Sequence, residues 1–266
     1  MSITIKVKKN IWLRLLLLIP ALLGIFPFLY MVITSLQQTY TLGLSFDSGS
    51  FNLKNYETIF KNYNFLRFFT NSVIVVVCAV FFNCLISALA AYGFAKKRFL
   101  GKNTVFWVYL ATLMIPPQVI LVPMYIIIQQ LNITNTYLSL FLPIINAFGV
   151  FLIKQFMENI PDELLEAARI DGCGELRLFF SIVIPLIRSV LIALALFTFI
   201  TSWNDFVWPL IVITDQNMST LTLALAELQG NYTTNYGLVM AGATLSFIPP
   251  FVLYLFLQKQ FVEGIA

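Results

Sequence analysis

The sequence EAARIDG (Glu166–Gly172), followed after nine residues by IVIP (Ile182–Pro185), is the longest charged interruption in an otherwise apolar chain. Pro161 lies shortly before it and predicts a helix start, because the N–H group that proline lacks would be unpaired in the first helical turn. Gly172 can adopt the left-handed backbone conformation that ends many helices. Residues 158–186 are therefore predicted to form two short helices with a tight corner between them. A partner protein could bind such a projecting shape.

The composition places most of the chain in a membrane. Of its 266 residues, 59% are hydrophobic and only 11% are charged, whereas soluble domains carry about 25% charged residues. A membrane-spanning helix needs about 20 mostly apolar residues, and the apolar runs are too long for barrel strands. The predicted fold is all-α, a polytopic membrane protein that forms a single domain over residues 1–266. Six transmembrane helices are predicted, at 12–36, 71–95, 105–129, 137–156, 190–213 and 237–258.

The positions of lysine and arginine predict the orientation of these helices, because cytoplasmic loops carry an excess of basic residues. Of the 16 basic residues, 3 lie in the loop after the first span, namely Lys54, Lys61 and Arg67. The other 13 lie in the N-terminal segment, after the second span, in or beside residues 158–186, and in the C-terminal tail. Both termini and the segment 158–186 are therefore expected in the cytoplasm.

Missing residues exclude several classes of function. Without histidine, the chain has neither a histidine-ligated metal site nor a Ser-His-Asp triad. The stretch Gly101-Lys102-Asn103-Thr104 lacks the preceding glycine of a phosphate-binding loop and the Ser or Thr that follows its lysine. The chain is therefore not predicted to bind ATP, a metal or another cofactor, and it is not predicted to be an enzyme.

The pair of stretches Glu166–Gly172 and Ile182–Pro185 resembles the EAA loop of ABC importer permeases, and the resemblance covers nearly the whole chain. In that family the loop, here about residues 158–186, forms coupling helices that dock on ATPase subunits in the cytoplasm. Further motifs are similar to the carbohydrate-uptake branch, and to the maltose type in particular. These are AAYGF (90–94), MIP (114–116), IPDEL (160–164), SWNDF (202–206), WPL (208–210) and TL (220–221).

The resemblance implies a permease subunit that imports a sugar or oligosaccharide across the bacterial cytoplasmic membrane. It implies two ATPase subunits, which bind ATP and magnesium, a second and non-identical permease, and an extracytoplasmic sugar-binding protein. No nucleic acid is expected as a partner. The residues do not identify the sugar, and they do not show whether this subunit itself binds the sugar. The chain ends at Ala266, without the Gly-rich tail of related chains, which leaves any contact of the tail with the ATPases open.

Six residues of the EAA loop are predicted to couple the chain to its ATPases. Glu166 is the main candidate, since a carboxylate on a docked helix can pair with a basic residue of a partner. Its alternative role is to stabilise the helix dipole, which is worth only about 0.3–1 kcal/mol, and the two roles can coexist. Small side chains allow close approach, and the glycine sets the corner. The full set is Glu166, Ala167, Ala168, Asp171, Gly172 and Pro185.

A second set of residues is expected to line the translocation pathway. Asp205 is the only charged residue placed well inside a predicted span, and carboxylates in such positions usually face the interior of the helix bundle. Trp203 and Asn204 lie beside it and can contact a sugar. The alternative is that all three form a polar cluster at the membrane interface. Met114 and Pro116 belong to a proline-containing stretch that predicts a bent helix beside the pathway.

Three other classes of function can be compared with the same sequence features. A secondary transporter driven by an ion gradient is disfavoured, because only one intramembrane carboxylate and no obvious internal repeat are found. An intramembrane enzyme lacks a set of catalytic residues. A purely structural membrane subunit is compatible with the composition. Among these classes, only an ABC permease requires the EAA loop.

Overall fold

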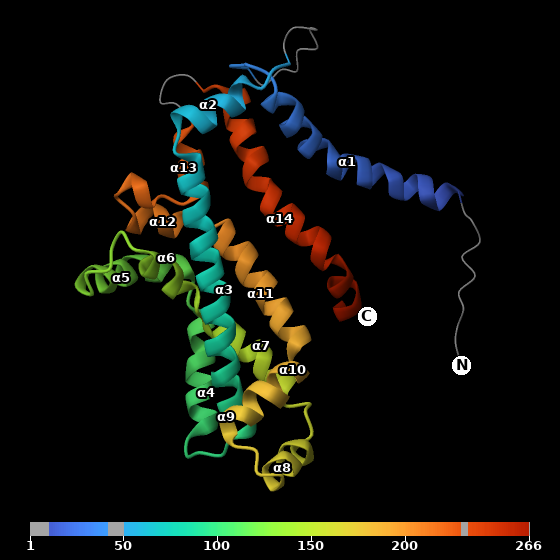
Figure 1. Ribbon diagram of the computed structural model, residues 1–266, viewed down its shortest axis with the longest axis vertical. Helices are drawn as coiled ribbons and strands as arrows, with labels where there is room; N and C mark the ends of the chain where they lie inside the picture. The colour runs from blue at the N-terminus through green and yellow to red at the C-terminus, as the bar shows by residue number, and fades with distance from the viewer. Residues whose placement is uncertain (1–10, 42–50, 230–233, 266) are drawn as a thin grey trace. The chain divides into compact units, whose positions relative to one another are not determined.

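The computed structural model describes residues 11–41, 51–229 and 234–265, and within them every regular element is a helix and no strand forms (Figure 1). The predicted all-α fold is therefore confirmed. The helices divide into two compact units, Met1–Asn64 with Leu225–Ile248, and Phe65–Ala224 with Pro249–Ala266. Each unit is described by itself, and the assignment of residues 1–266 to one domain stays a prediction.

The helical elements follow one another with short connections. The first half of the described chain contains α1 (Ile11–Ser35), α2 (Lys54–Asn62), α3 (Phe65–Lys96), α4 (Lys102–Ala111), η1 (Thr112–Met114), α5 (Pro117–Gln130), α6 (Tyr137–Phe141) and η2 (Leu142–Ile144). The second half contains α7 (Ala147–Met157), α8 (Asp162–Ile170), α9 (Glu175–Leu178), η3 (Phe179–Val183), α10 (Ile184–Leu186), α11 (Arg188–Trp203), α12 (Val207–Val212), η4 (Gln216–Met218), α13 (Leu221–Glu227) and α14 (Tyr236–Ile265).

In the first unit, α2 is fixed to the residues that follow α1. Asn55, which is 1% exposed, donates from Nδ2 to the carbonyl oxygens of Ser35 at 2.9 Å and Gln37 at 2.8 Å. The start of α14 packs closely against the same segment, because a Cβ atom on Gly237 would overlap the carbonyl group of Gln37. The position therefore requires glycine.

In the second unit, α3 is the central helix, and it packs along α7 and α11 (Figure 1). Gly149 of α7 permits this approach, because a Cβ atom there would overlap Ser87 of α3 and lie 3.0 Å from Leu194 of α11. A buried hydrogen bond of 2.9 Å from Asn83 Nδ2 to Thr198 Oγ1 joins α3 to α11. Small residues and buried polar pairs of this kind are typical of helix packing in membranes.

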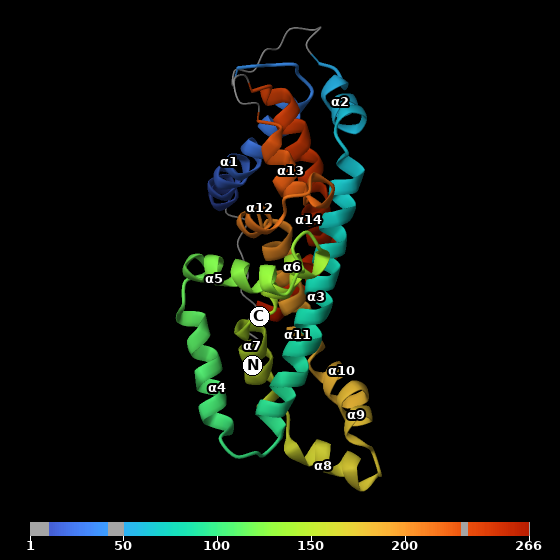
Figure 2. The same ribbon diagram turned by 90° about the vertical axis from the view of Figure 1, so that its left-hand side faces the viewer.

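Three helical segments are each long and apolar enough to cross a membrane, namely Leu16–Ser35, Phe65–Lys96 and Tyr236–Phe256. Three further pairs of segments pass the same test together but are bent, by 105° between α4–η1 and α5, by 46° between α6–η2 and α7, and by 78° between α9–α10 and α11. Figure 2 shows the sharp turn between α4 and α5. If each bent pair is one crossing, the described residues form six spans, which is the predicted number.

The fifth predicted span, at 190–213, differs from the structure. Helix α11 ends at Trp203, and α12 begins separately at Val207. Asp205 lies in the break, where its Oδ1 atom accepts a hydrogen bond of 3.4 Å from the N–H group of Trp208. Aspartate favours such capping positions, because its side chain competes with the backbone bonds of a helix interior. The expectation of one continuous helix here is therefore corrected.

Candidate functional site

The predicted corner of the EAA loop is present. Helix α8 begins at Asp162, with Pro161 as its N-cap residue. It ends in a Schellman motif, in which the N–H of Gly172 donates to the carbonyl of Arg169 and the N–H of Cys173 donates to that of Ala168, both at 3.0 Å. Gly172 has a φ of +79°, so the left-handed conformation expected of it is confirmed.

The second segment of the EAA loop runs from Glu175 through Leu186 and includes a π-helical turn, η3, at Phe179–Val183. Pro185 lies directly after this turn, and the chain then bends by 78° before α11 begins at Arg188. Proline has no N–H group, and its ring collides with the carbonyl four residues earlier, which accounts for the irregular turn. The bend thus separates the loop segment α9–η3–α10 from α11, the longer helix of this bent pair.

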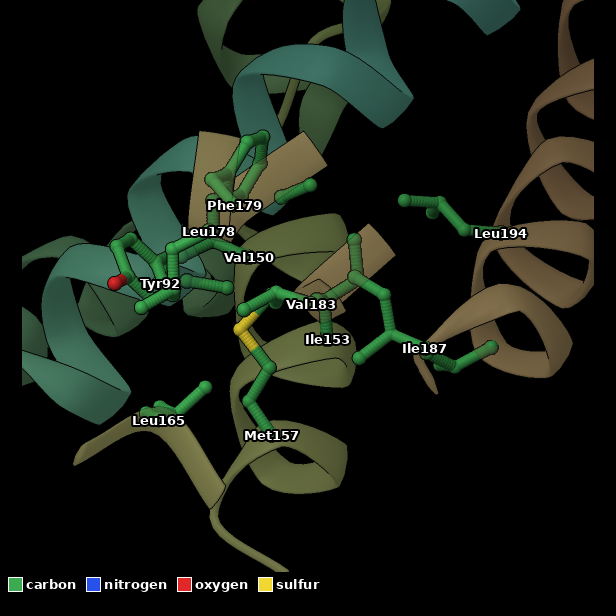
Figure 3. Close-up of a cluster of buried hydrophobic side chains, with 13 residues drawn as sticks. Tyr92, Val150, Ile153, Met157, Leu165, Leu178, Phe179, Val183, Ile187 and Leu194 are labelled. Atoms are coloured by element: carbon green, nitrogen blue, oxygen red, sulfur yellow. The ribbon is translucent and has the colours of Figure 1, made fainter. Parts of the chain in front are cut away.

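The inner face of the EAA loop rests on α3 and α7 through a buried apolar cluster (Figure 3). Leu165 of α8, Leu178 of α9 and Phe179 of η3 are each 2% exposed or less. The ring of Phe179 lies 5.4 Å, centroid to centroid, from the ring of Tyr92 on α3. Met157 at the end of α7 is fully buried in the same cluster. The loop is thus packed onto the central helix over both of its short segments.

Glu175 forms a group of polar contacts, here called the clasp, that links the loop to Tyr92 of α3 and to Lys97. Its Oε2 atom accepts from Lys97 Nζ at 2.6 Å and from the hydroxyl of Tyr92 at 2.8 Å, and its Oε1 atom accepts from Arg169 Nε at 3.2 Å. The hydrogen bonds from Lys97 and Tyr92 lower the pKa of Glu175 from 4.5 to about 2. Glu175 is therefore ionised throughout the physiological pH range.

A second ion pair fixes the start of α8. Lys96 Nζ donates to Asp162 Oδ1 at 2.7 Å and to the carbonyl of Ile160 at 2.6 Å, and this lysine side chain is only 6% exposed. The hydrogen bond from Lys96 lowers the pKa of Asp162. None of these contacts between the loop and α3 was predicted from the sequence. The available signal was the motif AAYGF (90–94), which contains Tyr92 and is followed, after Ala95, by Lys96 at the end of α3 and by Lys97.

The outer face of the loop combines an acidic group with exposed apolar side chains. Glu166, Ala167 and Asp171 are exposed, and Ala168 is half-buried. Within the described residues, the carboxylate of Glu166 has no hydrogen bond or ion pair. The same loop also exposes Leu164 (46%), Ile170 (86%) and Leu176 (74%). This face is thus available to a partner.

The second unit also contains a cavity of about 800 Å³ at the breaks in its bent helices. Residues from the α4–α5 bend, from the α6–α7 bend and from the α11–α12 break line it. Tyr109, Gln118, Asn146 and Asp205 contribute polar groups to the wall, and Trp208 contributes its ring while its Nε1 donates to the carbonyl of Ser139 at 2.7 Å. The volume lies in the range of roughly 300–1,000 Å³ typical of small-molecule sites.

The five residues predicted for the pathway are placed differently from one another. Asp205 lines the cavity. Trp203 is 4% exposed, with its ring stacked on that of Phe199 at 5.7 Å. Asn204 is exposed, and its Nδ2 donates to the carbonyl of Ile200 at 2.8 Å. Neither Trp203 nor Asn204 is among the residues that line the cavity.

Met114 and Pro116 lie at the 105° bend that opens the cavity. Their neighbours Ile115 and Pro117 line it, whereas Met114 is 85% exposed outside it. The sequence reasoning did not identify Tyr109, Gln118, Asn146 or Trp208. Of these, only Trp208 lay in a quoted motif, WPL (208–210).

Bent membrane helices around a partly polar cavity define the class as a membrane transport subunit. The family comparison is more specific. The model of the family described as "Binding-protein-dependent transport system inner membrane component" matches residues 83–266, which is more than half of the chain. The chain belongs to this family. It is accordingly a transport permease and not an enzyme.

Relatives and solved structures agree with this family. The arabinooligosaccharide transport permease of Halalkalibacterium halodurans is 34% identical, over 92% of this chain and 90% of its own length. The lactose transport permease of Rhizobium radiobacter is 34% identical, over 92% and 90%. The sn-glycerol-3-phosphate transport permease of Escherichia coli O1:K1 / APEC is 35% identical, over 86% and 85%.

A crystal structure of a bacterial ABC transporter that imports the acidic polysaccharide alginate contains a chain with the same fold. Its TM-score is 0.82 over 94% of this chain and 95% of that chain, at 21% identity. A chain of the alginate transporter in complex with its periplasmic protein gives a TM-score of 0.63 over 93% of both chains, at 18% identity. At these identities the likeness supports the fold alone.

Proposed function

We propose that this chain is one of two permease subunits of an ATP-driven importer that moves a sugar or oligosaccharide across the bacterial cytoplasmic membrane. Relatives named for arabinooligosaccharide and lactose transport support the sugar class. A second, non-identical permease completes the pathway, two ATPase subunits bind ATP and magnesium, and an external binding protein delivers the sugar. The excess of basic residues puts both termini and the EAA loop in the cytoplasm, although Lys6, Lys8 and Lys9 lie outside the described residues.

The observation that carries the proposal is the two-faced construction of α8. Leu165 is buried against the core on one face, while Glu166 is exposed on the other and has no partner within the described chain. An ATPase subunit that binds the outer face moves α8, which is held to α3 by the contacts described above. Movement of the loop then reaches the helices around the cavity, and the residues proposed for this coupling are Glu166, Ala167, Ala168, Asp171, Gly172 and Pro185.

Glu166→Ala tests the docking role, with Glu163→Ala as the matched control. Both residues are exposed acids in the N-terminal half of α8, and Glu163 lies in its first turn. If the carboxylates acted only on the helix dipole, Glu163→Ala would have the larger effect, because that interaction is confined to the first turn. We expect the opposite: Glu166→Ala lowers uptake per ATP hydrolysed and weakens ATPase retention, while Glu163→Ala does neither.

Assembly is tested by purifying the tagged chain from its native membrane in a mild detergent, followed by mass spectrometry. We expect an ATPase with Walker motifs and a second multi-span permease to be retained. Recovery of the chain alone, from a preparation that retains other known complexes, would contradict the proposal and favour an ion-driven transporter. Normal uptake and assembly of Glu166→Ala would leave the importer standing and remove the role of Glu166.

A further inference from the structure

The wall of the cavity carries almost no charge. Among the described residues that line it, Asp205 is the only Asp, Glu, Lys or Arg. The sequence has no such residue from position 103 to position 153, the stretch that supplies most of the wall. The cavity is therefore partly polar, weakly acidic and without a cation of its own.

The two basic residues at the ends of that stretch are engaged elsewhere. Lys102 donates from Nζ to the carbonyl of Lys97 at 3.1 Å. Lys154 pairs with Glu158 at 2.6 Å, and its Nζ atom lies 4.4 Å from the ring centroid of Phe106. Neither lysine lines the cavity. A negatively charged ligand therefore finds no compensating group among the described residues of the wall.

The other groups in the wall suit a sugar. Tyr109, Phe148 and Phe197 supply aromatic surface, and the rings of Phe148 and Phe197 are 4.8 Å apart between centroids. Aromatic rings pack well on the apolar C–H faces of sugar rings at a small cost in conformational entropy. The amide of Gln118 can both donate to and accept from sugar hydroxyls. None of these contacts requires a charge on the ligand.

We infer that the cavity admits neutral oligosaccharides and excludes anionic saccharides such as uronates and sugar phosphates. A carboxylate or phosphate inside it faces Asp205 with no cation from the described wall between them, and like charges repel. Asp205 instead accepts hydrogen bonds from sugar hydroxyls. The inference rests on the proposed function, and it separates this chain from its relative named for sn-glycerol-3-phosphate and its structural neighbour named for alginate.

The test uses the complete transporter, purified with its partners and binding protein, in proteoliposomes supplied with ATP. Uptake of lactose and arabinotriose is compared with uptake of lactobionate, an alginate trisaccharide and sn-glycerol 3-phosphate. We expect uptake of a neutral sugar and, for each anion, a rate below about one-tenth of it, since one like-charge repulsion at an effective dielectric constant of about 20 gives a factor of this order or more. Equal or faster uptake of an anion overturns the inference and leaves sugar import intact. ATP hydrolysis without uptake of any saccharide overturns the proposed function itself.

A pair of variants isolates the charge. Asp205→Asn preserves the shape of the side chain and its ability to cap α12, since Asn and Asp are similar as caps. We expect it to raise the ratio of anion uptake to neutral uptake about tenfold. Asp215→Asn is the matched control, because Asp215 also caps a short helix, through the N–H of Asn217 at 2.9 Å, but lies outside the cavity. The preference of the binding protein cancels in this ratio, so an unchanged ratio in Asp205→Asn contradicts the inference.

Discussion

The EAA loop and the cavity belong to the same unit of the molecule, yet they differ sharply in their content of charged side chains. The loop is rich in charge, and its carboxylates at Asp162 and Glu175 form ion pairs with the lysines at the end of α3. Among the described residues, the cavity has one charged side chain, Asp205, and the rest of its wall consists of aromatic, amide, hydroxyl and aliphatic groups. The difference matches the proposed roles of the two regions, docking of a partner at the loop and contact with a sugar at the cavity.

The two regions also differ in how the backbone is used. In the loop, the Schellman motif at Gly172 and the apolar cluster around Phe179 fix both short segments onto the central helix. At the cavity, the helices are interrupted. The chain bends by 105° between α4 and α5, and α11 and α12 are separated by the break that contains Asp205. Interrupted helices leave backbone and side-chain groups to face a pathway. In the proposed importer, movement of the loop would act on the places where these helices already bend.

The sharpest contrast is between two phenylalanines, one in each region. Phe179→Ala removes a ring that is 2% exposed in the core beneath the loop, and we expect a loss of about 3–5 kcal/mol, as for large-to-small changes in packed cores. Phe197→Ala removes a ring that is 46% exposed at the cavity, and we expect a loss of less than about 1 kcal/mol together with slower uptake. Thermal unfolding of the purified complex and uptake into proteoliposomes measure the two effects.

The contrast fails if the effects are reversed or equal. A stable Phe179→Ala complex would mean that the loop does not depend on the apolar cluster for its position. Strong destabilisation by Phe197→Ala would mean that the cavity is a packed core and not an open pathway. Each outcome removes one side of the comparison, and neither depends on the identity of the sugar.

Two glycines of the loop provide the next test. A Cβ atom at Gly172 or at Gly174 would have no heavy atom within 4 Å, so both positions have room for a side chain. Only Gly172 has a left-handed backbone conformation, with a φ of +79°. We expect Gly172→Ala to destabilise the loop by about 1–2 kcal/mol, the cost of that conformation for an L-residue. Gly174→Ala, with a φ of −68°, is expected to be neutral or slightly stabilising. Equal unfolding temperatures for the two variants would show that the corner does not require glycine.

The loop could be predicted from the sequence because its signals are local. Pro161 and Gly172 lie eleven residues apart, and each acts on its own turn of backbone, so the start and end of α8 follow from the residues themselves. The clasp around Glu175 could not be predicted in the same way. Its partners Tyr92 and Lys97 are about 80 residues away along the chain, and only the packing of α9 beside α3 brings them together.

The cavity was less predictable for a related reason. Its wall extends from Tyr109 to Trp208, and which side chains face it depends on the angles at which the helices bend. Pro116 and its neighbours predict a bend but not its angle. Trp203 and Trp208 look alike in the sequence, yet the helix break between them buries the first against Phe199 and places the second at the cavity.

Glu175→Gln tests the clasp between the loop and α3. Glu175→Gln removes the ion pairs with Lys97 and Arg169, but the Glu175 side chain is 52% exposed, so solvent screens these pairs. We expect a loss of about 1 kcal/mol, which lowers the unfolding temperature by about 2–4 °C. We also expect more ATP to be hydrolysed per sugar moved, because the loop then moves partly without α3. Lys97→Gln with Glu175→Gln completes a double-mutant cycle, and a zero coupling energy contradicts the clasp.

The pH dependence distinguishes the clasp from a simple surface charge. A carboxyl with a lowered pKa stabilises the fold above its unfolded pKa, near 4.5, and this contribution is lost as the pH falls toward the folded value of about 2. The difference in stability between the wild type and Glu175→Gln should therefore be constant from about pH 5.5 to pH 8 and should shrink below about pH 4.5. A difference that already disappears near pH 6 would mean that Lys97 and Tyr92 do not stabilise the ionised form of Glu175. The EAA loop would then be held by its apolar cluster and by the Lys96–Asp162 ion pair.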